Sequence, residues 1–266
     1  MKSDALEALL TSLREHGYFE GNKVIITCDN GGKPYTITRK DNPNHPLFTD
    51  NDLDSIEMPS ARQVAEKFEG VEVIHGKGRG GVAVNKNRAI KYFLDHKEYD
   101  YLLMLDDDIV FHAPGFINLC IKSGHRHLTG YLGDPGDTSI LFGELRSPFF
   151  QTFPPQGEDD YVWYCKGSQG MMLWTDRATI EAVGYMDKMP GHYGMEHSLL
   201  SSRINRLIET KFQDWFPVLI GCHLFFHSQS IPNNYIADYS QNEKYWHKRK
   251  EEVFKGINLK VKHWEE

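Results

Sequence analysis

Apolar positions recur along the chain with two different spacings, which predict helices and strands in turn. Near the start the apolar positions are spaced as on one face of a helix, at Leu6, Leu9, Leu10 and Leu13. A short β-branched run over residues 24–27 then leads into Cys28-Asp29-Asn30-Gly31-Gly32, which predicts a buried strand followed by a turn. Residues 33–59 contain four prolines and many Asn and Asp, a composition that favours loops.

From residue 61 the two spacings alternate. We expect a helix over 61–68, a strand over 71–74, a helix through Ala89, Ile90 and Phe93, and an apolar strand over 101–105. Helices over 175–183 and 196–208 and a strand over 218–220 complete the predicted core. This order is typical of α/β proteins with a mostly parallel, doubly wound sheet flanked by helices, whose ligands bind beyond the carboxyl ends of the strands.

Composition narrows the class of protein. The 266 residues include 40% hydrophobic and 25% charged residues, as in ordinary globular proteins. Because acidic residues interrupt the first helix and no apolar run reaches about 18 residues, we expect neither a signal peptide nor a membrane span. The four cysteines form no C-x-x-C pair, and the formal net charge is -7. A soluble, cytoplasmic protein is the expectation.

Three aspartates directly follow the apolar strand 101–105. Asp106, Asp107 and Asp108 place mutually repelling charges at the carboxyl edge of the sheet, and a divalent cation is the simplest neutraliser. In strand geometry Asp106 and Asp108 would point to one side. The triplet is also compatible with a solvated strand end or a helix cap.

Three segments in order resemble a known family. YDYLLMLDDDIVF resembles the strand and D-x-D motif of GT-A glycosyltransferases, particularly the family-two group. Upstream, GKGRGGVAVNKNRAI is similar to the glycine-containing loop and Asn-rich helix start of that family. Downstream, KGSQGMMLWTDRATIEAVGYMDKMPGHYGMEHSLLSSRI resembles its acceptor-side segment, with Glu196-His197 where Glu-Asp is usual.

The resemblance covers roughly residues 24–228 and implies a single GT-A domain. It would occupy residues 1–235, with a donor half over about 1–110 and an acceptor half over about 111–235. Residues 236–266 would form a polar, helical tail, whose lysines mix with glutamates.

The same resemblance implies roles for particular residues. Mn or Mg would be held by Asp106, Asp108 and a late histidine, His227. A nucleotide-sugar donor would be bound by Asp106 and Asp107 together with Asp29, Arg79 and Asn87. Glu196 would be the catalytic base. His223 and His227 are four residues apart, so if both lay on a strand they would share a face, and His227 is the preferred ligand.

The expected function is therefore a metal-dependent glycosyltransferase. It would move a sugar from a nucleotide sugar, with a UDP-sugar expected, to an acceptor hydroxyl with inversion. The acceptor would be a saccharide or glycan, or a hydroxymethylated DNA base of the phage type. Two alternatives stay open, a nucleotidyltransferase and a non-catalytic module that binds calcium or carbohydrate.

Overall fold

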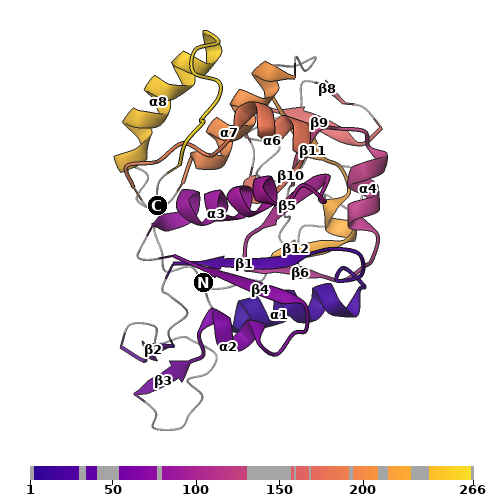
Figure 1. The fold of residues 1–266 in the computed structure, drawn as a ribbon, viewed down its shortest axis with the longest axis vertical. Coiled ribbons are helices and arrows are strands. Elements are labelled where there is room, and N and C mark those ends of the chain that lie inside the picture. The colour runs from indigo at the N-terminus through magenta and orange to yellow at the C-terminus, as the bar shows by residue number, and fades with distance from the viewer. Residues whose placement is uncertain are drawn as a thin grey trace.

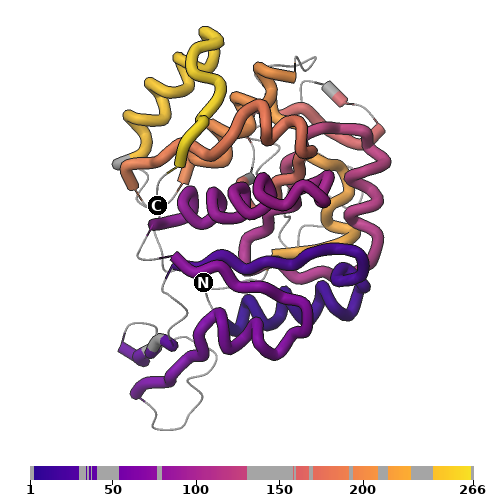
Figure 2. Tube along the Cα trace, viewed as in Figure 1, coloured from indigo at the N-terminus to yellow at the C-terminus, as the bar shows by residue number. Residues whose placement is uncertain are grey.

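A computed structural model describes most of the chain. The described residues are 3–29, 34–40, 54–76, 80–130, 157, 158, 160–167, 169–191, 194–208, 215–228 and 240–264. In this part the chain is a mixed α/β protein, and Figures 1 and 2 show helices packed on both sides of its strands.

The helices are distributed along the whole chain. They are α1 (Ser3–Glu15), α2 (Ala61–Ala65), α3 (Gly81–Asp95), α4 (Phe116–Lys122), α6 (Arg177–Val183), α7 (Glu196–Leu207), the short 3₁₀ helix η1 (Cys222–Leu224) and α8 (Ser240–Phe254). The predicted helices over 61–68, 175–183 and 196–208 correspond to α2, α6 and α7. Asp176 caps α6, since its side chain accepts a hydrogen bond from the Thr179 amide, and residue 175 therefore still belongs to the preceding strand.

The strands form one large and three small sheets. They are β1 (Val24–Cys28), β2 (Tyr35–Thr38), β3 (Ser55–Met58), β4 (Val71–His75), β5 (Tyr101–Leu105), β6 (Ile109–Phe111), β7 (His127–Gly130), β8 (Gly157–Glu158), β9 (Val162–Cys165), β10 (Gln169–Asp176), β11 (Phe216–Leu219) and β12 (Phe226–Ser228). The large sheet has the order β5-β10-β7-β11-β9-β8, and the small ones pair β1 with β4, β12 with β6, and β2 with β3.

The prediction of a mostly parallel sheet is wrong for the described strands. Within the large sheet only β7 and β11 pair in parallel, and outside it β1 and β4 do so, whereas every other pair is antiparallel. The prediction assumed a crossover helix after each strand, which parallel pairing requires. The link between β8 and β9 has too few residues to contain a crossover helix.

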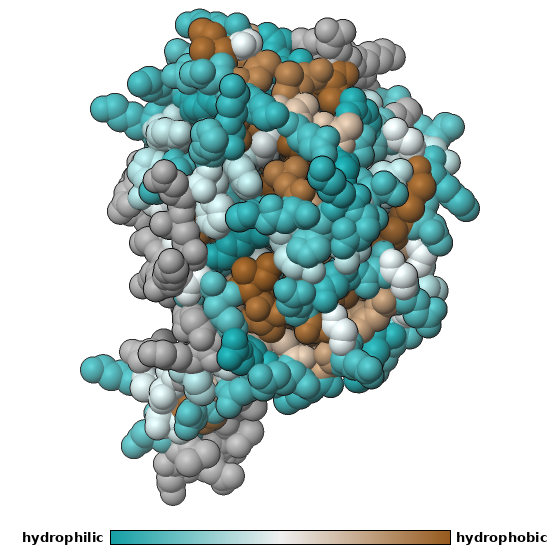
Figure 3. All heavy atoms as spheres, viewed as in Figure 1, coloured by the Kyte–Doolittle hydropathy of each residue, from teal (hydrophilic) through white to brown (hydrophobic). Residues whose placement is uncertain are grey.

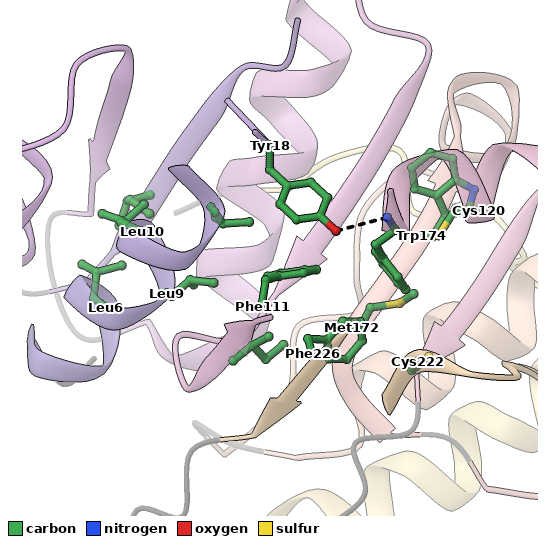
Figure 4. Close-up of a cluster of buried hydrophobic side chains, with 14 of the residues drawn as sticks. Leu6, Leu9, Leu10, Tyr18, Phe111, Cys120, Met172, Trp174, Cys222 and Phe226 are labelled. Atoms are coloured by element: carbon green, nitrogen blue, oxygen red, sulfur yellow. Dashed lines mark hydrogen bonds between the residues drawn. The ribbon is translucent and has the colours of Figure 1, made fainter. Parts of the chain in front are cut away.

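The β5–β10 pair separates two apolar cores. On one side Leu102 and Met104 pack with Leu173 and with the buried faces of α3, α6 and α7. On the other side Met172 and Trp174 join α1, β6 and β12, and Figure 4 shows this cluster. Here the Tyr18 hydroxyl accepts a hydrogen bond from the Phe116 amide at 3.1 Å and donates one to the Ala113 carbonyl, which ties the end of α1 to the start of α4.

The C-terminal helix α8 is packed against α7 rather than extended into solvent (Figure 1). Asn242 and Val253 on α8 are both 0% exposed. The buried Asp187 carboxylate pairs with Arg249 of α8 at 2.6 Å and with Arg203 of α7 at 3.1 Å. Residues 240–264 are thus part of the same packed body as the predicted acceptor half.

The surface of the described residues is largely polar. On the face drawn in Figure 3, polar groups predominate and apolar groups are exposed in separate patches. The large apolar side chains that are exposed, Tyr101, Ile121, Leu207, Leu224 and Ile257, come from separate segments of the chain. None of the described helices is long and apolar enough to cross a membrane.

Candidate active site

The site begins where β5 ends. Asp106 extends the β5–β10 ladder by one residue, because its amide donates to the Met171 carbonyl at 2.8 Å. Side chains alternate along a strand, so Asp106 lies on the same side as Leu102 and Met104, which face α3 and α7. The chain then turns through Asp107 and Asp108 into β6.

A buried lysine from α3 meets Asp106. Lys86 is only 8% exposed, and its Nζ lies 3.2 Å from Asp106 Oδ1 and donates to the Gly170 carbonyl at 2.6 Å. A buried ammonium group needs such partners to offset its desolvation. Lys86 therefore fixes the end of β5 against α3 and β10.

Glu196 lies close to the same lysine. Glu196 is the first residue of α7 and is 4% exposed. Burial raises the pKa of its carboxyl group, but a hydrogen bond from His197 and the nearby Lys86 outweigh burial and hold that pKa below the ordinary value. A β-carbon on Gly170 would lie 2.4 Å from the His197 ring, so only glycine allows that ring to approach β10 so closely. The result is an ionised, buried carboxylate within electrostatic range of Lys86.

Asp108 is the most unusual carboxylate of the three. Its Oδ1 is buried and has no hydrogen-bond partner within the described residues. Burial, followed by repulsion from Asp106 and Asp107, raises the pKa of Asp108 to about 6, although the Ser228 side chain opposes the shift by hydrogen bonding. A buried carboxylate oxygen without a partner is costly, and a bound cation would remove that cost.

The late histidine reaches this region through strand pairing. β12 runs antiparallel to β6, with His227 opposite Val110 and Ser228 opposite Ile109, the residue after Asp108. The His227 and His112 rings are stacked, with centroids 5.6 Å apart. Burial, and then the neighbouring His112, lowers the pKa of His227, so that its ring favours the neutral form that ligates metals.

The expectation that His223 shares a strand with His227 is wrong. His223 lies in η1, because Gly221 adopts a left-handed conformation that starts a 3₁₀ turn. The four-residue spacing of His223 and His227 therefore does not place them on the same face of one strand.

The three carboxylates and His227 are a chemically suitable but incomplete set of metal ligands. Oxygen ligands suit Mg and Mn, and His nitrogen is compatible with Mn. Within the described residues no group of three or more His, Cys, Asp or Glu side chains is gathered closely enough to hold a metal ion by itself. The unpartnered Asp108 oxygen is the observation that fits a cation here.

The structure gives Asp29 a set of protein partners. Its Oδ2 accepts hydrogen bonds from the Gly80 and Gly81 amides at 3.0 and 2.9 Å, and its Oδ1 pairs with Arg88 at 2.9 Å. Asp29 thus holds the start of α3, and nucleotide contact by it stays a prediction. Arg79, the predicted cationic contact, lies outside the described residues.

The structure also gives Asn87 protein partners, so nucleotide contact by it stays a prediction. It is 1% exposed, its Oδ1 accepts from the Met186 amide at 2.7 Å, and its Nδ2 donates to the Met186 carbonyl at 3.1 Å. These bonds join α3 to the segment after α6. The sequence pattern around Asn87 does not distinguish such a contact between two segments from ligand binding.

Two residues that shape the site, Lys86 and Asn242, were not predicted from the sequence. Lys86 carried a usable signal, because Lys86, Ile90 and Phe93 follow helical spacing and a lysine on that apolar face needs a buried partner. The sequence contains no comparable signal for Asn242. Its Oδ1 accepts from the Gly191 amide at 2.6 Å and its Nδ2 donates to the Gly194 carbonyl at 3.0 Å, so α8 holds both ends of the segment that precedes Glu196.

Comparisons with known proteins add little to this geometry. No protein-family model matches the chain, and no curated protein matches it. Among solved structures, the crystal structure of A197 from STIV matches with 20% sequence identity and a TM-score of 0.28, over 42% of this chain and 56% of that one. The match spans little more than half of that protein, and a likeness of this degree supports no inference about the fold or the function.

Proposed function

We propose that this chain is a metal-dependent glycosyltransferase that takes its sugar from a nucleotide sugar, with a UDP-sugar as the expected donor. The observation that carries the proposal is that one buried lysine, Lys86, pairs with Asp106 at the end of β5 and also interacts electrostatically with Glu196 at the start of α7. The resemblance of the D-x-D and Gly-x-Glu segments to GT-A glycosyltransferases supports the same reading.

In this proposal Asp106, Asp108 and His227 hold Mn or Mg, and the donor diphosphate supplies further ligands. The bound cation would offset the negative charge that develops on the leaving diphosphate. The unpartnered Asp108 oxygen and the crowding of three carboxylates support a cation at this position. Asp107, in the same turn, would contact the donor.

Glu196 acts as the general base. A base must be ionised at working pH, and the hydrogen bond from His197 together with the nearby Lys86 keeps the pKa of Glu196 low despite its burial. The carboxylate would accept the proton of the acceptor hydroxyl as that oxygen attacks the anomeric carbon. A single displacement of this kind inverts the configuration at that carbon.

Lys86 serves as a positioning residue in this arrangement. Its ammonium group contacts Asp106 and interacts electrostatically with Glu196, so it offers both acids a nearby positive charge before donor and cation arrive. The acceptor is a saccharide or a hydroxymethylated DNA base.

A thermal-shift screen of nucleotide sugars tests the proposal. Each of a set of UDP-, GDP- and TDP-sugars is added with and without Mn²⁺, and the melting temperature is recorded. We expect at least one nucleotide sugar to raise the melting temperature only when Mn²⁺ is present, since binding to the native state alone stabilises it. Stabilisation by nucleoside triphosphates alone would favour a nucleotidyltransferase, and stabilisation by calcium without any nucleotide would favour a binding module.

A further inference from the structure

A second polar pocket lies apart from the residues of the candidate active site. It has a volume of about 360 Å³ and is formed by α8, by residues 187 and 188, and by the C-terminal segment 258–261. Its charged lining residues are Asp187, Lys188, Lys248, Arg249, Glu252 and Lys260.

The two acids of this pocket are already neutralised. Asp187 pairs with Arg249 and Arg203, and Glu252 pairs with Arg249 at 3.1 Å. Arg249 also donates to the Asn258 carbonyl, which fixes the C-terminal segment against α8. The floor of the pocket is thus a closed ion-pair network that has little capacity for a ligand.

Three lysines at the pocket are left without an acidic partner among the described residues. Lys188, Lys248 and Lys260 are exposed, and Lys260 makes a hydrogen bond to the Glu181 carbonyl rather than an ion pair. Tyr245 adds a phenol to the wall, and burial followed by the charge of Asp187 raises its pKa, so the hydroxyl keeps its proton. The pocket therefore presents cations and a hydroxyl donor.

The C-terminal segment that contains α8 also carries more positive than negative charge, unlike the rest of the chain. Residues 240–266 contain seven Lys and Arg and five Glu, whereas the rest of the chain contains 23 Lys and Arg and 32 Asp and Glu. A basic segment on an acidic protein concentrates polyanions locally against the repulsion of the remaining surface.

We propose that this pocket binds phosphate groups, with Lys188 and Lys248 pairing with adjacent phosphates of one ligand. Lysine is a common point-charge partner for phosphate, and two lysines that line one pocket from different segments, Lys188 before α7 and Lys248 on α8, suit a diphosphate or two neighbouring phosphates of a nucleic-acid backbone. The inference does not depend on sugar transfer, because the pocket shares no residue with the Asp106–Glu196 site.

Binding to two probes tests the pocket and distinguishes the sources of phosphate. Sodium pyrophosphate is titrated by calorimetry, and a fluorescein-labelled DNA duplex by anisotropy, against the full chain without Mn²⁺. Lys188→Gln/Lys248→Gln is compared with Lys97→Gln/Lys122→Gln, which removes the same charge from exposed positions outside the pocket. All four lysines are exposed, so both variants are expected to fold.

We expect at least one probe to bind, the duplex with a Kd of about 10⁻⁴ to 10⁻⁶ M. The pocket variant should weaken that binding roughly tenfold or more, and for the duplex it should reduce the slope of log K against log salt by about 2. Binding of pyrophosphate alone identifies free polyphosphate as the ligand, and binding of the duplex alone identifies the backbone. An Asp108→Asn variant keeps this affinity, which separates the pocket from the candidate active site. Failure of both probes to bind, or equal weakening in the two lysine variants, would overturn the proposal.

Discussion

Lys86 Nζ lies 3.2 Å from Asp106 Oδ1, which joins the middle of α3 to the last residue of the β5 ladder. Because the charge of Lys86 also lowers the pKa of Glu196, one buried cation interacts with two acids that are 90 residues apart in the sequence. This contact connects the two segments that resemble glycosyltransferase motifs.

The Asp108 carboxylate, whose Oδ1 has no hydrogen-bond partner among the described residues, leads to a prediction about stability. Asp108→Asn removes a buried charge that burial and the neighbouring aspartates disfavour, so at pH 7 without metal the protein should be as stable or more stable. We expect a melting temperature that is unchanged or higher by about 2 °C. Calorimetry with Mn²⁺ and UDP should show that binding is lost. A melting temperature well below wild type would mean that Asp108 serves the fold.

Glu196→Gln separates catalysis from helix capping. We expect donor binding to be retained and transfer to fall by about 10² to 10⁴-fold, because the amide keeps the shape and loses the basicity. An acid that only stabilises the helix dipole would contribute about 0.3 to 1 kcal/mol and leave turnover nearly intact.

The matched control for that variant is Glu243→Gln, an acid in the first turn of α8 that is exposed. Melting temperature and transfer rate are measured for both variants. If the two variants behave alike, with a small stability loss and normal turnover, Glu196 is not the base.

Asn242→Ala tests whether α8 positions Glu196. Loss of the two bonds to Gly191 and Gly194 should destabilise the protein by about 1 to 3 kcal/mol, because buried backbone groups lose their partners. Well below the melting temperature, we expect kcat to fall about tenfold or more while donor affinity stays close to wild type.

Asn205→Ala supplies the comparison, since Asn205 is also a buried asparagine that bonds a backbone carbonyl, that of Trp215, at 2.7 Å. Among the described residues, no hydrogen bond joins Asn205 to the segment before Glu196. Equal losses of kcat in the two variants would show that Asn242 acts only through stability.

His127 predicts a pH dependence of stability. It is buried between the Trp174 carbonyl and the Ser201 hydroxyl, and burial lowers its pKa from 6.5 to about 4. The unfolded chain therefore binds a proton at higher pH than the folded chain does. Its contribution to stability is present above pH 6.5 and is lost as the pH falls toward 4.

Urea denaturation at pH 7.5 and pH 5 measures this dependence. His127→Asn can still donate to the Trp174 carbonyl but does not titrate, so its loss of stability between the two pH values should be smaller by about 1 to 2 kcal/mol. An unchanged difference would show that His127 titrates normally in the folded protein.

Local elements of the fold were predictable, whereas their pairing was not. The apolar run 101–105 corresponds to β5 and the pattern over 196–208 to α7, since burial on one or both faces imposes a period on the sequence. Antiparallel pairing of β10 with β5 depends on contacts between residues about 70 positions apart, and no local period encodes them.

The residues of the candidate site were likewise only partly predictable from the sequence. The aspartate cluster was visible because three consecutive acids after an apolar strand are unfavourable without a partner. The contribution of Asn242 was not visible, because it arises from the docking of α8 on α7. Nucleotide contact by Asn87 stays a prediction, because a buried amide that joins two segments, as Asn87 does, and an amide that binds a ligand look the same in the sequence.

Release of nucleoside diphosphate from a nucleotide sugar tests the central proposal most directly. Purified wild type is incubated with the UDP-, GDP- or TDP-sugar that stabilises it, with Mn²⁺ or with EDTA, and the diphosphate is quantified with time. We predict slow hydrolysis by wild type that requires Mn²⁺, and none by Asp108→Asn or Glu196→Gln. Release that is absent from wild type with every donor, or that persists in Asp108→Asn, would contradict the assignment of this site to glycosyl transfer.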